Sequence, residues 1–290
     1  AEPLRVLGRL KKGYASLLRS ITLGTGQSSA EQVKGCIAEM QSVIEKEPDN
    51  PYARDVAGGC YAIAADAAQS RGENPEPIIR KSIELLEPVL QKHPRFLWGL
   101  NDVAGFYLFL AMYQQLHGLP QAKESFEKTL HYERSAAALD ETYVAAYTNL
   151  LLANSRLVGY TRSEAELTDV LQKTEEISKW CSKINDQYQQ CHINYVAVCS
   201  RAAERQLLAG LSASDSLRLA RERIDKLRKL GSNFLDALQH MALSRLLEAR
   251  VLVQQGQDPL ASLRDLDEII KQCLAIADKD AMCRTLDAQA

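Results

Sequence analysis

The tetrad Asp55-Val56-Ala57-Gly58 occurs a second time, 47 residues later, as Asp102-Val103-Ala104-Gly105. A self-match at a period in the forties is typical of stacked helical hairpins, in which each repeat packs mainly against its neighbours. Glycines that end apolar-periodic runs follow nearly the same period, at Gly72, Gly118, Gly159, Gly210 and Gly256. We therefore interpret the chain as a helical-repeat protein rather than one closed core.

A second series of chain breaks lies between these glycines and recurs every 46 residues, at Pro48, Pro94, Asp140, Asp186, Ser232 and Asp278. The two series together predict an all-α, right-handed superhelix of about six helical hairpins. We expect a single helical-repeat domain over residues 1–290, with no low-complexity linker to divide it.

The composition is that of a soluble globular protein, with 46% hydrophobic and 25% charged residues among 290. A net charge of -2 gives no electrostatic case for binding nucleic acid or an anionic membrane. The longest apolar run, Phe106 to Tyr113, is too short to span a bilayer. The start at Ala1 shows no signal peptide, so we expect a mature form or a piece of a longer protein.

Apolar periodicity predicts helices over Leu4 to Ser20 and from Ser28 to about Glu47, followed by two alternating classes. The more apolar class, which we name the A helices, covers roughly 51–71, 96–117, 141–158, 190–209 and 235–255. The more charged class, which we name the B helices, covers roughly 75–92, 120–138, 162–184, 213–230 and 259–276. A partial helix from Ala281 to Ala290 ends the chain.

Local signals support the starts of the B helices. Asn74-Pro75 and Asp258-Pro259 each place a capping acceptor before a proline. Thr161 followed by Glu164 fits a capping box. Small residues inside the A helices would let neighbouring backbones approach closely, namely Gly58, Gly59, Ala104, Gly105, Ala145 and Ala146.

A helical hairpin repeated in register, with small residues in mid-helix and proline ending some units, resembles the tetratricopeptide repeat family. The resemblance covers nearly the whole chain, although each unit is about a dozen residues longer than the usual length of roughly 34. The family's aromatic residue near the start of helix A is present at Tyr52 and Trp98 and missing from that place in later units.

This resemblance implies that the A helices line a concave groove that holds a protein, peptide or small ligand. Polar and aromatic side chains on otherwise apolar helices suggest such a lining, because polar groups are rarely buried without a partner. The candidates are Asp55, Trp98, Asn101, Asp102, Tyr143, Tyr147, Asn149, Asn154, Arg156, Asn194, Arg201, Arg205, His240 and Arg245. Hydrogen bonds between helices or exposed helix ends are the alternative for each of them.

The long units and two Gly-x-[Asn/Asp]-Pro turns, Gly72–Pro75 and Gly256–Pro259, more narrowly resemble repeat regions that follow the kinase domain of bacterial serine/threonine protein kinases. The chain has no glycine-rich loop, His-Arg-Asp or Asp-Phe-Gly motif of its own. The resemblance therefore implies a sensing or docking region without its catalytic half.

Six of the seven cysteines lie in pairs equidistant from a predicted B-to-A turn. Residues placed in this way lie at similar height in an antiparallel hairpin, as a disulfide requires. The predicted pairs are Cys36–Cys60, Cys181–Cys191 and Cys273–Cys283, which leaves Cys199 alone. Such disulfides would place the protein in an oxidising compartment, such as the periplasm. The alternative is seven buried thiols in a cytoplasmic protein.

Motifs for catalysis are missing. The histidines, including His192 and His240, form no metal-binding pair, and there is no Gly-x-Ser-x-Gly elbow, phosphate loop or dinucleotide fingerprint. The A helices also lack lysine, which argues against a co-chaperone that grips a carboxylate. We predict a non-catalytic recognition or sensor domain without cofactor or metal. The alternatives are a cytosolic scaffold and an α/α toroid enzyme, which would need a paired-carboxylate cleft.

Overall fold

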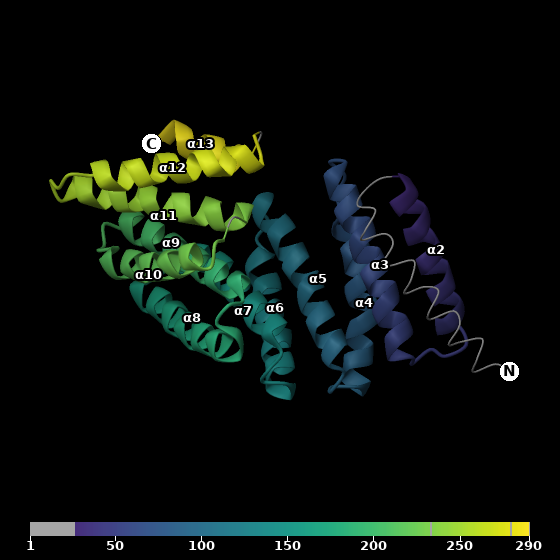
Figure 1. Ribbon diagram of the computed structural model, residues 1–290. Coiled ribbons are helices and arrows are strands. Elements are labelled where there is room, and N and C mark those ends of the chain that lie inside the picture. The colour runs from purple at the N-terminus through teal and green to yellow at the C-terminus, as the bar shows by residue number, and fades with distance from the viewer. Residues whose placement is uncertain (1–26, 233, 279, 290) are drawn as a thin grey trace. The chain divides into compact units, whose positions relative to one another are not determined.

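The computed structural model describes residues 27–232, 234–278 and 280–289, and within those ranges every regular element is a helix (Figure 1). The predicted all-α fold of antiparallel helical hairpins is confirmed. The helices are α2 (Gln27–Ile44), α3 (Pro51–Ser70), α4 (Glu76–Lys92), α5 (Leu97–Leu116), α6 (Ala122–Leu139), α7 (Val144–Leu157), the short η1 (Val158–Tyr160), α8 (Glu164–Asn185), α9 (Gln189–Leu208), α10 (Ser214–Lys229), α11 (Leu235–Gln254), α12 (Leu260–Ile276) and α13 (Ala281–Gln289).

These bounds agree with the expected A helices (α3, α5, α7, α9 and α11) and B helices (α4, α6, α8, α10 and α12) to within a few residues. The first expected helix, Leu4 to Ser20, lies outside the described residues. The chain divides into two compact units, Ala1–Ala146 and Tyr147–Ala290, which we call unit 1 and unit 2. The expectation of a single domain stays a prediction.

Four of the five A helices end at a glycine. The backbone there adopts a positive φ, a left-handed conformation that favours glycine. Gly72, for example, has a φ of 77°, and the amide of Glu73 after it donates to the carbonyl of Ala68, five residues earlier, at 2.9 Å. This bond closes the helix end in a Schellman motif. Gly159 instead lies in η1, after α7 has ended early at Leu157. This early end accounts for the position of Gly159, which comes five residues before a 46-residue step from Gly118.

Side-chain hydroxyls join each B helix to the A helix before it in unit 1. Ser82 on α4 donates to the carbonyl oxygen of Gly58 at 2.8 Å, and Thr129 on α6 donates to that of Ala104 at 3.4 Å. A Cβ added at Gly58 would lie 3.0 Å from the ring of Phe106, so the ring would have to shift slightly to admit a side chain there. The same atom at Gly105 would meet nothing within 4 Å, so the expectation that Gly105 permits close packing is wrong.

The helix caps are partly as predicted. The side chains of Asn74 and Asp258 each accept a hydrogen bond of 2.9 Å from the amide two residues later, at the starts of α4 and α12. The capping box of α8 uses Ser163 and Glu166 rather than Thr161 and Glu164. Thr161 fails as the cap because its hydroxyl donates to the carbonyl of Val158 in η1, which delays the helix by two residues.

The buried cores are local to each unit. In unit 1, α4, α5 and α6 share a core that includes Ile79, Leu86 and Val103. In unit 2, α10 and α11 pack through Leu217 and Leu247. Of the helices that the structure describes, none combines the length and the hydropathy of a bilayer-spanning segment.

Candidate functional site

Two aspartates from successive A helices meet in unit 1. Asp55 on α3 and Asp102 on α5 form a side-chain hydrogen bond, and Asn101 donates to Oδ1 of Asp102 at 3.1 Å. Burial, and then the charge of Asp102, raise the pKa of Asp55 well above its usual value. Burial also raises the pKa of Asp102, while the bonds from Asn101 and Asp55 oppose that rise. The pair therefore retains one proton, on Asp55, when Asp102 is ionised.

Tyr143, which is close enough to these carboxyl groups for their charges to affect its pKa, forms an aromatic pair with Trp98. Trp98 is 60% exposed, and its ring meets that of Tyr143 edge-on, with 6.4 Å between the centroids. Burial, followed by the charges of Asp102, Glu133 and Asp55, raises the pKa of Tyr143 to about 12. We call the set Asp55, Trp98, Asn101, Asp102 and Tyr143 the aromatic–acidic surface.

The aromatic–acidic surface suits a cation. Among the described residues, neither Asp55 nor Asp102 forms an ion pair within the chain. An exposed indole face attracts Lys or Arg through its quadrupole, and an adjacent carboxylate adds a charge-assisted hydrogen bond. The sequence analysis named all five residues but missed the meeting of Asp55 with Asp102. The signal was the repeated tetrad itself, because equivalent positions of stacked repeats face each other.

In unit 2 the structure brings together Arg156 of α7, Arg201 of α9 and His240 of α11: burial and then the charge of Arg201 lower the pKa of Arg156, and burial and then the charges of both arginines lower the pKa of His240. One ring or guanidinium nitrogen of each is buried without a hydrogen-bond partner, namely Nε of both arginines and Nδ1 of His240. This basic cluster was not expected as a group, although each member was a candidate.

The other candidates of unit 2 lie apart from that cluster or already have structural contacts. Asn194 is buried and donates to the carbonyl of Thr148 at 2.9 Å, and Asn154 bonds to Thr174 at 3.2 Å. Arg205 donates to the carbonyl of Thr161 at 3.0 Å. These are the hydrogen bonds between segments that the sequence analysis left open as the alternative. Tyr147 is buried and Asn149 half-buried on α7.

The three predicted cysteine pairs lie at disulfide distance in the structure. The Cα separations are 6.4 Å for Cys36–Cys60, 6.2 Å for Cys181–Cys191 and 6.3 Å for Cys273–Cys283. Cys181–Cys191 and Cys273–Cys283 each link the end of one helix to the start of the next, whereas Cys36–Cys60 links the middles of α2 and α3. Cys199 is buried on α9, and burial raises the pKa of its thiol to about 12. The oxidised state of the pairs stays a prediction.

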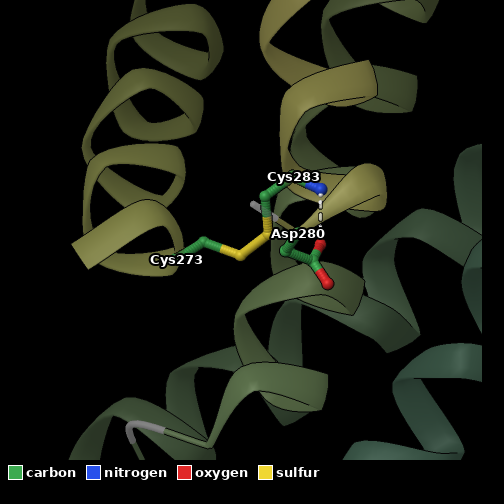
Figure 2. A group of neighbouring side chains, drawn as sticks. All are labelled: Cys273, Asp280 and Cys283. Atoms are coloured by element: carbon green, nitrogen blue, oxygen red, sulfur yellow. Dashed lines mark hydrogen bonds between the residues drawn. A yellow bond between two sulfur atoms is a disulfide. The ribbon is translucent and has the colours of Figure 1, made fainter. Parts of the chain in front are cut away.

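One group of side chains has the composition of a metal site. The ligand atoms of Cys273, Asp280 and Cys283 lie within 4.8 Å of one another (Figure 2). However, Oδ1 of Asp280 accepts the amide of Cys283 at 2.8 Å and thereby caps α13, while Oδ2 accepts from Gln239 at 3.0 Å. The two sulfurs are at disulfide distance from each other. A structural zinc ion needs four ligands, so this group fits a capped crosslink better than a metal centre.

Comparisons with known proteins give no family for this chain. No protein-family model matches it, and no curated protein sequence matches it either. Among solved structures, the fold is similar to that of a thermophilic tetratricopeptide repeat protein from Thermus thermophilus. That match has 15% sequence identity, covers 89% of this chain and 98% of the other, and has a TM-score of 0.41. We draw no argument from a likeness at this level.

Proposed function

We propose that the chain is a non-catalytic recognition domain, and that its aromatic–acidic surface binds a basic segment of a partner protein. The observation that supports this proposal is the position of Trp98, which is 60% exposed and lies four residues before Asp102 on α5, so that both side chains are on one face of the helix. Exposed tryptophan is the residue most enriched among the energetic centres of interfaces. A Lys or Arg side chain of the partner can lie on the indole while its charged end reaches Asp102.

The test is a binding measurement with two series of extended peptides of matched length, one carrying Lys and Arg and the other Glu and Asp. We expect the basic series to bind and the acidic series not to bind. Trp98→Ala and Asp102→Asn should each weaken binding of the basic series about tenfold or more. Trp180→Ala is the matched control, because Trp180 is an exposed tryptophan on a B helix, α8.

Two outcomes contradict the proposal. One is equal binding of the basic and acidic series to the parent protein. The other is loss of affinity in Trp180→Ala as large as in Trp98→Ala, because a general loss of surface hydrophobicity would then explain both effects.

We further propose that the domain works outside the cytoplasm, as the receptor region of a bacterial serine/threonine kinase. The three cysteine pairs at disulfide distance support the compartment. The long repeats and the Gly-x-[Asn/Asp]-Pro turns support the setting through their resemblance to kinase-linked repeat regions. Seven free thiols in protein made in an oxidising compartment would favour the cytosolic scaffold instead.

The carboxylate pair also bears on the enzyme alternative. Glycoside hydrolases hold their two carboxyl groups about 5 Å or more apart, whereas Asp55 and Asp102 bond directly to each other. A directly bonded pair that shares one proton is the arrangement of aspartic proteases. We expect no hydrolysis of unstructured peptides by this protein. Hydrolysis that disappears in Asp55→Asn would overturn the non-catalytic proposal.

A further inference from the structure

Three half-buried basic side chains in unit 2 lie together without an ion-pair partner. Arg156, Arg201 and His240 come from α7, α9 and α11. Among the described residues, none forms an ion pair with any of the three. The unpartnered nitrogens, Nε of each arginine and Nδ1 of His240, are shielded from solvent. Buried polar nitrogens normally have a partner, so this arrangement requires an explanation.

The energetic cost shows in the pKa values of the three groups. Burial, and then the charge of Arg201, lower the pKa of Arg156 to about 10. Burial also lowers the pKa of Arg201, and nearby Glu204 offsets only part of that effect. Burial, followed by the charges of Arg201 and Arg156, lowers the pKa of His240 to about 4, so the imidazole is neutral. Two guanidinium charges therefore remain uncompensated in this part of unit 2.

Arg245 of the same unit shows how the chain neutralises a buried guanidinium when the role is structural. Its guanidinium forms ion pairs with Glu248 at 2.8 Å and with Asp265 at 2.6 Å, so that two carboxylates face one charge, although its Nε also has no hydrogen-bond partner. Arg156 and Arg201 lack this arrangement. Arg245 is therefore neutralised by the chain itself, whereas the other two guanidinium groups can interact with an anion from outside the described part of the chain.

We propose that Arg156, Arg201 and His240 form a binding site for a dianionic phosphate group, either inorganic phosphate or the headgroup of a small phosphate monoester. The two positive charges of the guanidinium groups are balanced by a dianion. Each planar guanidinium can also donate two parallel N–H bonds to phosphate oxygens. A neutral imidazole adds one further hydrogen bond. This site is in unit 2 and does not depend on the partner surface proposed for unit 1.

A hollow beside the cluster gives room for the organic part of a monoester. It has a volume of about 440 Å³ and lies between α9, α11 and α13. Its lining includes Arg201, Glu204 and Leu243. The hollow reaches only Arg201 of the three basic residues, so the phosphate would lie at its inner edge and the organic part within it.

The test is calorimetric titration of the intact protein with inorganic phosphate, glycerol 3-phosphate and succinate, the last as a dianion built from carboxylates. We expect phosphate or its monoester to bind, and Arg156→Gln and Arg201→Gln each to weaken that binding at least tenfold. Arg264→Gln is the matched control, because Arg264 is an exposed arginine on α12. Arg156→Lys, which keeps the charge but not the fork, should retain part of the affinity and serves if the glutamine variant does not fold.

A second measurement separates a ligand site from a structural cluster. Without ligand, Arg156→Gln should unfold at the same temperature as the parent protein or higher, because it removes an uncompensated buried charge. Tighter binding of glycerol 3-phosphate than of phosphate identifies a monoester as the ligand, and the reverse order identifies free phosphate. Affinities unchanged in both glutamine variants, equal loss in Arg264→Gln, or tighter binding of succinate than of either phosphate probe would overturn the proposal.

Discussion

Asp55 and Asp102 are hydrogen-bonded to each other across α3 and α5, although 47 residues separate them in the chain. They occupy the same position in two copies of one tetrad, and stacking of the repeats brings the copies face to face. Two carboxyl groups at this distance cannot both be ionised without a large cost. The repeat that organises the fold therefore also creates the acidic half of the aromatic–acidic surface.

The first prediction concerns the proton shared by this pair. The pKa of Asp55 in the folded protein lies above its ordinary value of 3.8, so the stability that its proton provides is complete at lower pH. That contribution is lost as the pH rises through the folded-state pKa. Asp55→Asn cannot ionise and still offers a donor to Asp102. From about pH 5 to 8, we expect the free energy of unfolding to decline less in Asp55→Asn than in the parent protein. The difference between the two declines should be about 1 kcal/mol or more.

Chemical denaturation at several pH values measures this difference. Asp66→Asn is the control, because Asp66 is an exposed aspartate on the same helix, α3. Parallel stability profiles for the parent protein and Asp55→Asn would show that the pair does not share a proton in the folded state.

The second prediction compares two glycines of unit 1. Gly72 has a φ of 77°, where a Cβ is strained, so Gly72→Ala should lower the free energy of unfolding by about 1–2 kcal/mol. Gly105 is inside α5 with open space around the position of a Cβ, so Gly105→Ala should raise stability by about 0.5–1 kcal/mol. Thermal unfolding of the two variants checks both signs. An equal loss in both would mean that packing rather than backbone conformation determines the effect.

The third prediction concerns the thiols. Denatured, unreduced protein from an oxidising host should show one free thiol out of seven, and peptide mapping should identify it as Cys199. In the native protein this thiol should resist alkylation, because it is buried and its pKa is raised to about 12. Reduction of the three crosslinks should destabilise the protein by roughly 2–3 kcal/mol for each loop closed. A mapped link between cysteines of different pairs would contradict this arrangement.

The fourth prediction concerns a carboxylate that accepts two tyrosine hydroxyls. Glu87 on α4 accepts from Tyr107 at 2.9 Å and from Tyr132 at 2.7 Å, and the two rings stack on each other. Burial first, and then the bond and charge of Glu87, raise the pKa of both tyrosines. Glu87→Gln keeps a hydrogen-bond acceptor at this position but removes the negative charge, so both tyrosines should ionise at lower pH.

Ultraviolet titration of the phenolates measures this shift. Glu84→Gln is the control, because Glu84 is an exposed residue on the same helix and no contact with either tyrosine is found among the described residues. A titration curve of Glu87→Gln that superimposes on that of the parent would contradict the proposed role of the charge.

Helix positions could be predicted closely from the sequence because their signals are local. The glycines that end the A helices, such as Gly72 and Gly256, act within one turn of the chain. The capping box of α8 was misplaced by two residues because η1 engages the hydroxyl of Thr161, and nothing in the neighbouring residues announces a 3₁₀ turn.

The candidate sites were harder to predict because they depend on which helices pack together and on how the side chains are oriented. Trp98 and Tyr143 could be named from their positions in the repeat, but Asn194 shows that a polar residue of an A helix can instead be buried in an interhelical hydrogen bond. His240 does not follow the 46-residue step that relates other positions, so counting repeats would not place it near Arg156 and Arg201. Long arginine side chains can contact residues of neighbouring repeats, and the spacing of residues in the sequence does not predict those contacts.

The cysteine pairs, if oxidised, would also determine how the helical array unfolds. Cys36–Cys60 links the two helices of the first hairpin that the structure describes, and Cys273–Cys283 links those of the last. Local unfolding of a stacked array can involve a single hairpin such as either of these. A helix that opens at either turn stays tethered to the next helix through its crosslink. A protease that cuts between Cys36 and Cys60 would leave two fragments that separate only after reduction.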